Sequence, residues 1–73
     1  MNVYQLDLTA YSCPMPLLMA KKALASLPVH STLVICINLA SSQDDFKLLC
    51  EQYGYQWLGC QNEDIRRVIT IKK

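Results

Sequence analysis

The run Cys13-Pro14-Met15-Pro16-Leu17-Leu18-Met19-Ala20-Lys21-Lys22-Ala23-Leu24 predicts a helix with an unusual beginning. Proline in a helix interior removes a hydrogen bond, but in the first turn the missing N–H group has no helical acceptor anyway. Cys13–Pro16 is therefore a rigid helix start. Beyond it, apolar residues recur at helical spacing opposite two lysines until Pro28 ends the pattern, and this stripe consists of Leu17, Ala20, Leu24 and Leu27.

Strands are expected on both sides of this helix. Apolar residues alternate with polar or small ones through Tyr4–Leu8, which indicates a first strand. Leu33–Ile37 is short, apolar and β-branched, and this predicts a central strand that is buried on both faces. Tyr55–Leu58 and Val68–Ile71 predict two more strands, with Asn62–Asp64 as the turn of a hairpin.

A second helix is predicted between the central strand and the hairpin. Ser41–Ser42 offers capping oxygens, and Asp44–Asp45 places negative charge at the positive end of the helix dipole. Gly54 is a natural C-terminal stop. The apolar stripe of this helix consists of Phe46, Leu49, Cys50 and Tyr53.

The resulting order, β-α-β-α-β-β, predicts an α+β fold. Residues 1–73 are expected to form one domain, a two-layer α/β sandwich with both helices on one face of a mixed four-stranded sheet. The other face would then be partly open. Trp57 could lie there, although packing against the core is the simpler role for it.

Composition narrows the class of protein. Of 73 residues, 52% are hydrophobic and 18% charged, and no apolar stretch is long enough to cross a bilayer. Met1–Asp7 lacks the basic and apolar regions of a secretory signal, so we expect a cytoplasmic protein without a membrane partner. In a reducing compartment the four cysteines should be free thiols. These are Cys13, Cys36, Cys50 and Cys60.

Cys13 is the cysteine with a chemical rather than a structural interpretation. If Pro14 is the first helical residue, Cys13 is the N-cap, where Ser, Thr, Asp or Asn would stabilise the helix better. The positive end of the helix dipole favours thiolate, the form that attacks other sulfurs, and it would favour a persulfide anion equally. Cys36 and Cys50 lie in apolar patterns and are expected to be structural, whereas Cys60 is expected to be partly exposed.

Other chemistries find little support in the sequence. There is no Cys-x-x-Cys pair, and the only histidine, His30, lies in a loop, so neither a metal site nor a thioredoxin-type dithiol is expected. The chain has no phosphate-binding glycine loop and no nucleotide fingerprint, so we expect no cofactor. One reactive thiol without acid–base machinery is typical of a carrier whose partners complete each transfer.

The chain resembles the TusA/SirA-like sulfur-carrier family, whose signature is Cys-Pro-x-Pro at the start of the first helix. Cys13–Pro16 matches this signature, and the resemblance extends over nearly the whole chain. It implies a persulfide on Cys13, supported by Pro14 and Pro16. It also implies a cysteine desulfurase or rhodanese-like protein as sulfur donor, and a downstream protein as sulfur acceptor. Branches of the family serve tRNA thiolation, molybdenum-cofactor, selenium or oxidative sulfur metabolism.

Three positions depart from the family pattern. Ala10 and His30 stand where glycines are usual, and Asn38–Ala40 replaces an acidic-acidic-proline run. The thiol motif itself is intact. Since loops that border a motif are where partner choice is encoded, these departures bear on the choice of partner.

Two other functions remain open at this point. The first is a non-catalytic regulatory or binding module that contacts RNA or protein through the basic pairs Lys21–Lys22, Arg66–Arg67 and Lys72–Lys73, because the layout also resembles a domain of a translation initiation factor. The net charge of only +1 supplies no strong electrostatic field, so direct nucleic-acid binding is not expected. The second is a redox sensor in which oxidised Cys13 pairs with Cys60.

Overall fold

The computed structural model describes residues 2–12 and 14–73, so Cys13 lies outside the described residues. The order of elements is β-α-β-α-β-β, as the sequence predicts. The elements are β1 (Val3–Asp7), α1 (Met15–Ser26), β2 (Thr32–Asn38), α2 (Gln43–Tyr53), β3 (Gln56–Asn62) and β4 (Arg66–Lys72). Neither helix of the described chain is both long and apolar enough to traverse a bilayer.

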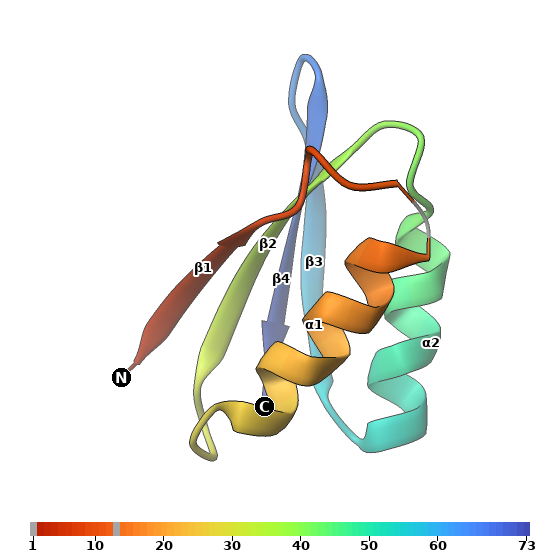
Figure 1. Ribbon diagram of the computed structural model, residues 1–73. Coiled ribbons are helices and arrows are strands. Elements are labelled where there is room, and N and C mark those ends of the chain that lie inside the picture. The colour runs from red at the N-terminus through yellow and green to blue at the C-terminus, as the bar shows by residue number, and fades with distance from the viewer. Residues whose placement is uncertain (1, 13) are drawn as a thin grey trace.

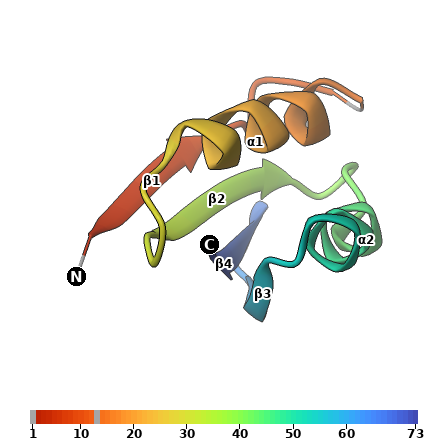
Figure 2. The same ribbon diagram turned by 90° about the horizontal axis from the view of Figure 1, so that it is seen from below.

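The four strands form one mixed sheet in the order β1-β2-β4-β3. β1 runs parallel to β2, whereas β2–β4 and β3–β4 are antiparallel pairs. The predicted hairpin is therefore confirmed. Both helices lie against the same face of the sheet (Figures 1 and 2), so the protein is the two-layer α+β sandwich expected from its sequence.

The core lies between that face and the two helices. Along β2, Leu33, Ile35 and Ile37 are buried, and in β4 Ile69 and Ile71 are fully buried beside them. Burial of a side chain of this size stabilises the fold by about 1.5–3 kcal/mol. The helices and the first loop complete the core with Leu8, Ala20, Leu24, Phe46, Leu49 and Cys50.

The prediction that the central strand is buried on both faces is wrong. Val34 and Cys36, which alternate with the core residues, are only partly buried, so β2 is central but not buried on both faces. The physical reason is that both helices cover one side of the sheet and none covers the other. Cys36 therefore differs from Cys50, which is buried in the core as predicted.

The α1 helix begins one residue later than expected. Pro14, with φ −94° and ψ 8°, is the N-cap and Met15 is the first helical residue, so Cys13 precedes the cap in the sequence. Pro16, Ala20 and Leu24 are buried along the inner face. The helix ends before Pro28 as predicted, and carbonyls at its end accept hydrogen bonds from the residue that follows β4. The Lys73 ammonium donates to the Leu27 carbonyl at 2.7 Å and to the Ala25 carbonyl at 3.3 Å.

The α2 helix follows the prediction in its acidic first turn and at its C-terminal end, but not in a capping bond from serine or along all of its stripe. Ser42 is the N-cap without a side-chain capping bond, and Asp44 and Asp45 occupy the first turn. Gly54 ends the helix with φ 75°. Tyr53, expected on the apolar stripe, is 49% exposed and stacks on the ring of Tyr55. The Tyr53 hydroxyl makes an exposed position favourable for this side chain, because it stays in water.

Trp57 packs on the helix side of the sheet. A register shift between Trp57 and Gly59 bends β3, and the half-buried indole contacts the core, with the Lys47 ammonium 5.7 Å from the ring centroid. Packing, the role that the sequence favours for Trp57, is therefore confirmed.

Substitutions at two residues with left-handed backbone, His30 and Gly54, should change the free energy of unfolding in opposite directions. His30 has φ 70°, a region that costs a residue with a Cβ about 1 kcal/mol. His30→Gly should therefore raise the free energy of unfolding by about 0.5–1 kcal/mol. Gly54→Ala should lower it by about 1 kcal/mol through backbone strain alone, because a Cβ at Gly54 would meet no atom within 4 Å.

Urea denaturation of both variants measures these changes. A loss of stability in His30→Gly would contradict the strain argument at that position and would point to a stabilising contact of the imidazole.

Candidate functional site

The two loops that follow β1 and β2 lie at the same end of the sheet, beside the first turns of both helices (Figure 1). We call this region the motif end, and it comprises residues 8–12, residues 14–18 and residues 38–42. Parallel strands bring their carboxyl ends to one edge, so the β1–β2 pairing creates this arrangement. The hairpin turn between β3 and β4 lies at the same end of the sheet.

The chain that leads into Cys13 is held at its start by β1 and β2. The Leu8 amide donates to the Cys36 carbonyl at 2.8 Å, and the Tyr11 amide donates to the Leu8 carbonyl at 3.1 Å. The Asp7 carboxylate accepts from the Thr9 hydroxyl at 2.7 Å and from the Thr9 amide at 3.0 Å. These hydrogen bonds lower the pKa of Asp7, and they stabilise its ionised form at neutral pH.

Asn38 joins the loop after β1 to the loop after β2. Its side-chain amide nitrogen donates to the Thr9 carbonyl at 3.1 Å and to the Tyr11 carbonyl at 2.9 Å. Its side-chain oxygen accepts from the amides of Ala40 and Ser41 at 3.0 and 3.1 Å, and from the Ser41 hydroxyl at 3.3 Å. In the sequence Asn38 is visible only as a departure from the family pattern, and its bridging role was missed.

The chain that leaves Cys13 is also fixed by hydrogen bonds. The Met15 amide donates to the Ser12 carbonyl at 3.0 Å, and the Leu18 amide donates to the Pro14 carbonyl at 3.2 Å. Pro16 is buried, whereas Pro14 is exposed. The residues on either side of Cys13 in the sequence, Ser12 and Pro14, therefore both take part in defined hydrogen bonds.

The first turns of the two helices differ in charge. In α1 the first turn has no acidic residue, whereas α2 has Asp44 and Asp45 there. Carboxylates in a first turn compensate the positive end of the helix dipole. That compensation is present in α2 and absent from the first turn of α1, so the positive potential at the start of α1 is available to an anion.

Exposed apolar side chains flank the motif on both sides. Tyr11 is 41% exposed, and Met15 and Leu18 on the first turn of α1 are 46% and 54% exposed. Leu39, in the loop after β2, is 49% exposed, and the bond from Asn38 to the Tyr11 carbonyl brings these two loops together. Exposed apolar side chains beside a reactive group are typical of a surface that meets another protein.

The three described cysteines have different surroundings. Cys50 is buried, and loss of hydration raises the pKa of its thiol. Cys60 is partly buried against the core, which also raises its pKa despite the nearby Arg67. A raised pKa lowers the fraction of thiolate at neutral pH and works against a resolving role for Cys60.

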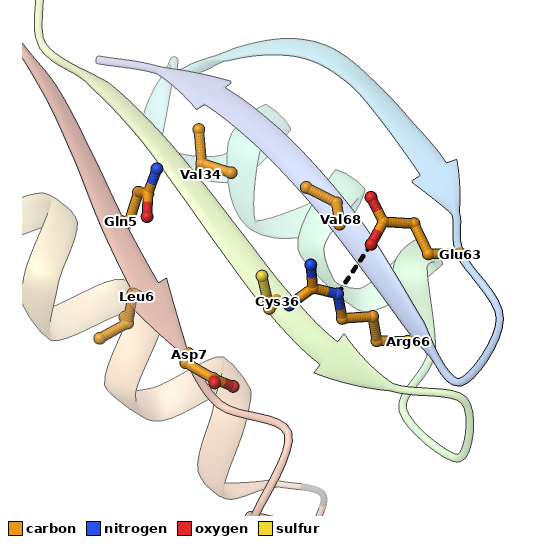
Figure 3. Close-up of a pocket in the computed structure, with 8 residues that line it drawn as sticks. All are labelled: Gln5, Leu6, Asp7, Val34, Cys36, Glu63, Arg66 and Val68. Carbon is orange, nitrogen blue, oxygen red and sulfur yellow. Dashed lines mark hydrogen bonds and ion pairs between the residues drawn. The ribbon is translucent and has the colours of Figure 1, made fainter.

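Cys36 lines a cavity of 490 Å³ on the open face of the sheet (Figure 3). The Arg66 guanidinium beside it is paired with Glu63, with 2.8 Å between Arg66 Nε and Glu63 Oε1. The period-two alternation of β2 could have identified Cys36 as a residue of this face, because it alternates with Ile35 and Ile37.

The three basic pairs contact different parts of the molecule. Lys21 lies over the Tyr53 ring at 5.1 Å, and Arg66 pairs with Glu63 in the hairpin. Arg67 donates to the Ser41 carbonyl at 3.1 Å, and Lys73 binds the end of α1. This dispersal gives no support to a single basic binding surface. Within residues 2–12 and 14–73, no three His, Cys, Asp or Glu side chains are grouped as metal ligands would be.

Comparison with known proteins identifies the family of this chain and agrees with its fold. Residues 4–73 match the family described as sulfurtransferase TusA. Two proteins of Neisseria meningitidis, from serogroups A and B, are each 36% identical to this chain over 64 residues. That match covers 88% of this chain and 86% of each relative, and both relatives are described as candidate sulfur carriers.

A crystal structure of a SirA-like protein from Desulfitobacterium hafniense has the same fold. It superimposes with a TM-score of 0.83 at 27% sequence identity, covering 94% of this chain and 95% of the other. The family match and these relatives together support a sulfur-carrier role for this type of protein. The chain belongs to the TusA family.

The raised pKa values of Cys50 and Cys60 predict slow alkylation at neutral pH. Because thiolate is the reacting species, the midpoint pH of the alkylation rate should be higher for both cysteines in the folded protein than in the unfolded protein. Iodoacetamide labelling from pH 6 to 10, quantified for each cysteine peptide by mass spectrometry, measures this. Protein unfolded in urea is the control, and equal rates for Cys60 in folded and unfolded protein at pH 7.5 would refute the prediction.

Proposed function

We propose that this protein carries sulfur as a persulfide on Cys13. The Cys13 thiolate attacks the outer sulfur of a donor persulfide, an S–S bond forms on Cys13 as the S–S bond of the donor breaks, and the donor leaves as a thiolate. The same exchange, with an acceptor thiolate as the attacking group, passes the sulfur on. No external oxidant is consumed, because the transferred sulfur keeps its oxidation state.

The observation that carries this proposal is the uncompensated start of α1. Cys13 stands one residue before the Pro14 cap in the sequence, and the first turn that follows has no carboxylate. A positive local potential lowers the free energy of thiolate and persulfide anions relative to their protonated forms. In this proposal Pro14 and Pro16 keep the helix start rigid, so that the potential has a constant direction.

We assign the rest of the relay to partner proteins. A cysteine desulfurase or a rhodanese-like protein supplies the sulfur, and a downstream protein accepts it, with tRNA thiolation as one candidate pathway. Residues 1–73 act as one domain in the cytoplasm. The exposed side chains of Tyr11, Met15, Leu18 and Leu39 form the surface on which these partners dock in turn.

Loss of the Cys13 thiol should abolish sulfur loading. Wild type incubated with a cysteine desulfurase, its cofactor and free cysteine should gain the mass of one sulfur atom, and reductant should remove it. Cys13→Ser should gain none, because a hydroxyl forms no persulfide. Cys36→Ser and Cys60→Ser should load like wild type, and full loading of Cys13→Ser, measured as intact mass, would exclude Cys13 as the carrier.

A charge at Leu18 should impair transfer between proteins without affecting the thiol. Leu18→Glu should reduce the rate of loading from a desulfurase by about tenfold, because docking would bury a carboxylate in an apolar contact. Loading from sodium polysulfide, which needs no docking, should be unchanged. Leu48→Glu on α2 is the matched control, since Leu48 is 55% exposed and Leu18 is 54% exposed. Equal slowing by both variants would show that Leu18 has no particular part in docking.

A further inference from the structure

The Asn38 side chain makes five hydrogen bonds that connect two loops of the motif end. Two are donated to carbonyls of the loop before Cys13, at Thr9 and Tyr11. Three are accepted from its own loop, at Ala40 and Ser41. A carboxamide has two N–H donors and one carbonyl oxygen, so its donors and its acceptor are all in use.

The partners fix the orientation of this amide. Backbone carbonyls only accept and backbone N–H groups only donate, so the nitrogen must face Thr9 and Tyr11 while the oxygen faces Ala40 and Ser41. An aspartate would keep the acceptor for the second loop but would present an oxygen to the two carbonyls. The acidic residue usual at this position of the family pattern is therefore unable to make the same bridge.

The loop before Cys13 depends on this bridge for its attachment to the neighbouring strand. The Thr9 amide and hydroxyl bond to Asp7, and the Tyr11 amide bonds to Leu8, so these contacts are local. Within the described chain, two hydrogen bonds join residues 9–12 to a segment distant in the sequence, and Asn38 donates both. Tyr11 is separated from Cys13 by Ser12 alone.

We propose that Asn38 is a positioning residue, which fixes the loop at residues 9–12 and thereby sets the place of the Cys13 thiol relative to the start of α1. The inference rests on the proposed function of Cys13. It also assigns a second role to the same side chain, because Asn38 holds the loop that carries the exposed Leu39. In this proposal one amide holds the segment that leads to Cys13 and one part of the docking surface in a fixed relation.

The test compares Asn38→Asp and Asn38→Ala with wild type. Both variants lose the two N–H donors, and Asn38→Asp retains an acceptor for Ala40 and Ser41. With the loop released, the midpoint pH for alkylation of Cys13 should rise in both variants, and the rate of persulfide loading should fall by roughly tenfold. Peptide-resolved labelling gives Cys50 and Cys60 as internal controls, and their profiles should not move.

Gly54→Ala serves as the control for loss of stability. It weakens the fold at the end of α2, away from the motif end, and should leave the pH profile of Cys13 unchanged. If Asn38→Asp has the wild-type profile and loading rate, or if Gly54→Ala shifts the profile equally, the positioning role is excluded.

Hydrogen exchange of the Asn38 side-chain amide in wild type tests the bridge without any substitution. The side-chain amide protons of Asn38 should exchange with solvent more slowly than those of Asn2 and Asn62, which are exposed. Equal exchange rates in NMR spectra would exclude the bridge. If wild type accepts no sulfur from any donor, the proposed function fails, while the alkylation profile still decides whether Asn38 positions the thiol.

Discussion

The parallel pairing of β1 with β2 is the constraint on which the motif end depends. Parallel strands cannot be joined by a tight turn, so the chain must cross back along the sheet, and α1 makes this crossing. The pairing also brings the carboxyl ends of both strands to one edge. The loop that leads to Cys13 and the loop that begins at Asn38 are therefore neighbours, although about 30 residues separate them in the chain.

The first turns of the two helices, which lie at this end of the sheet, differ in charge. In α2 the carboxylates of Asp44 and Asp45 compensate the positive end of the dipole, while the first turn of α1 has apolar side chains and buried Pro16. The start of α1 therefore favours a negatively charged group, whereas at the start of α2 two carboxylates already compensate the dipole. Pro14 and Pro16 let α1 begin without a capping side chain, because they lack N–H groups that would otherwise need acceptors.

Much of the fold could be predicted because it is encoded locally. Helical spacing after Pro16, the turn residues Asn62–Asp64 and the apolar run Leu33–Ile37 each identify an element without reference to the rest of the chain. Predictions went wrong where a neighbour decides the outcome. Cys36 is only partly buried since no helix covers its face of β2, and Tyr53 lies outside the core, where it stacks on Tyr55 beside Lys21.

The sequence by itself determined the order of the elements, the proline-rigid start of α1 and the identity of the candidate thiol at Cys13, because each of these depends on residues within one or two turns of chain. Only the tertiary structure decided that Asn38 bridges the two loops and that the basic pairs are dispersed over separate contacts. Those features depend on strand register and on which loops share an edge. Such relations arise from pairing across the sheet, and no local pattern of residue types specifies them.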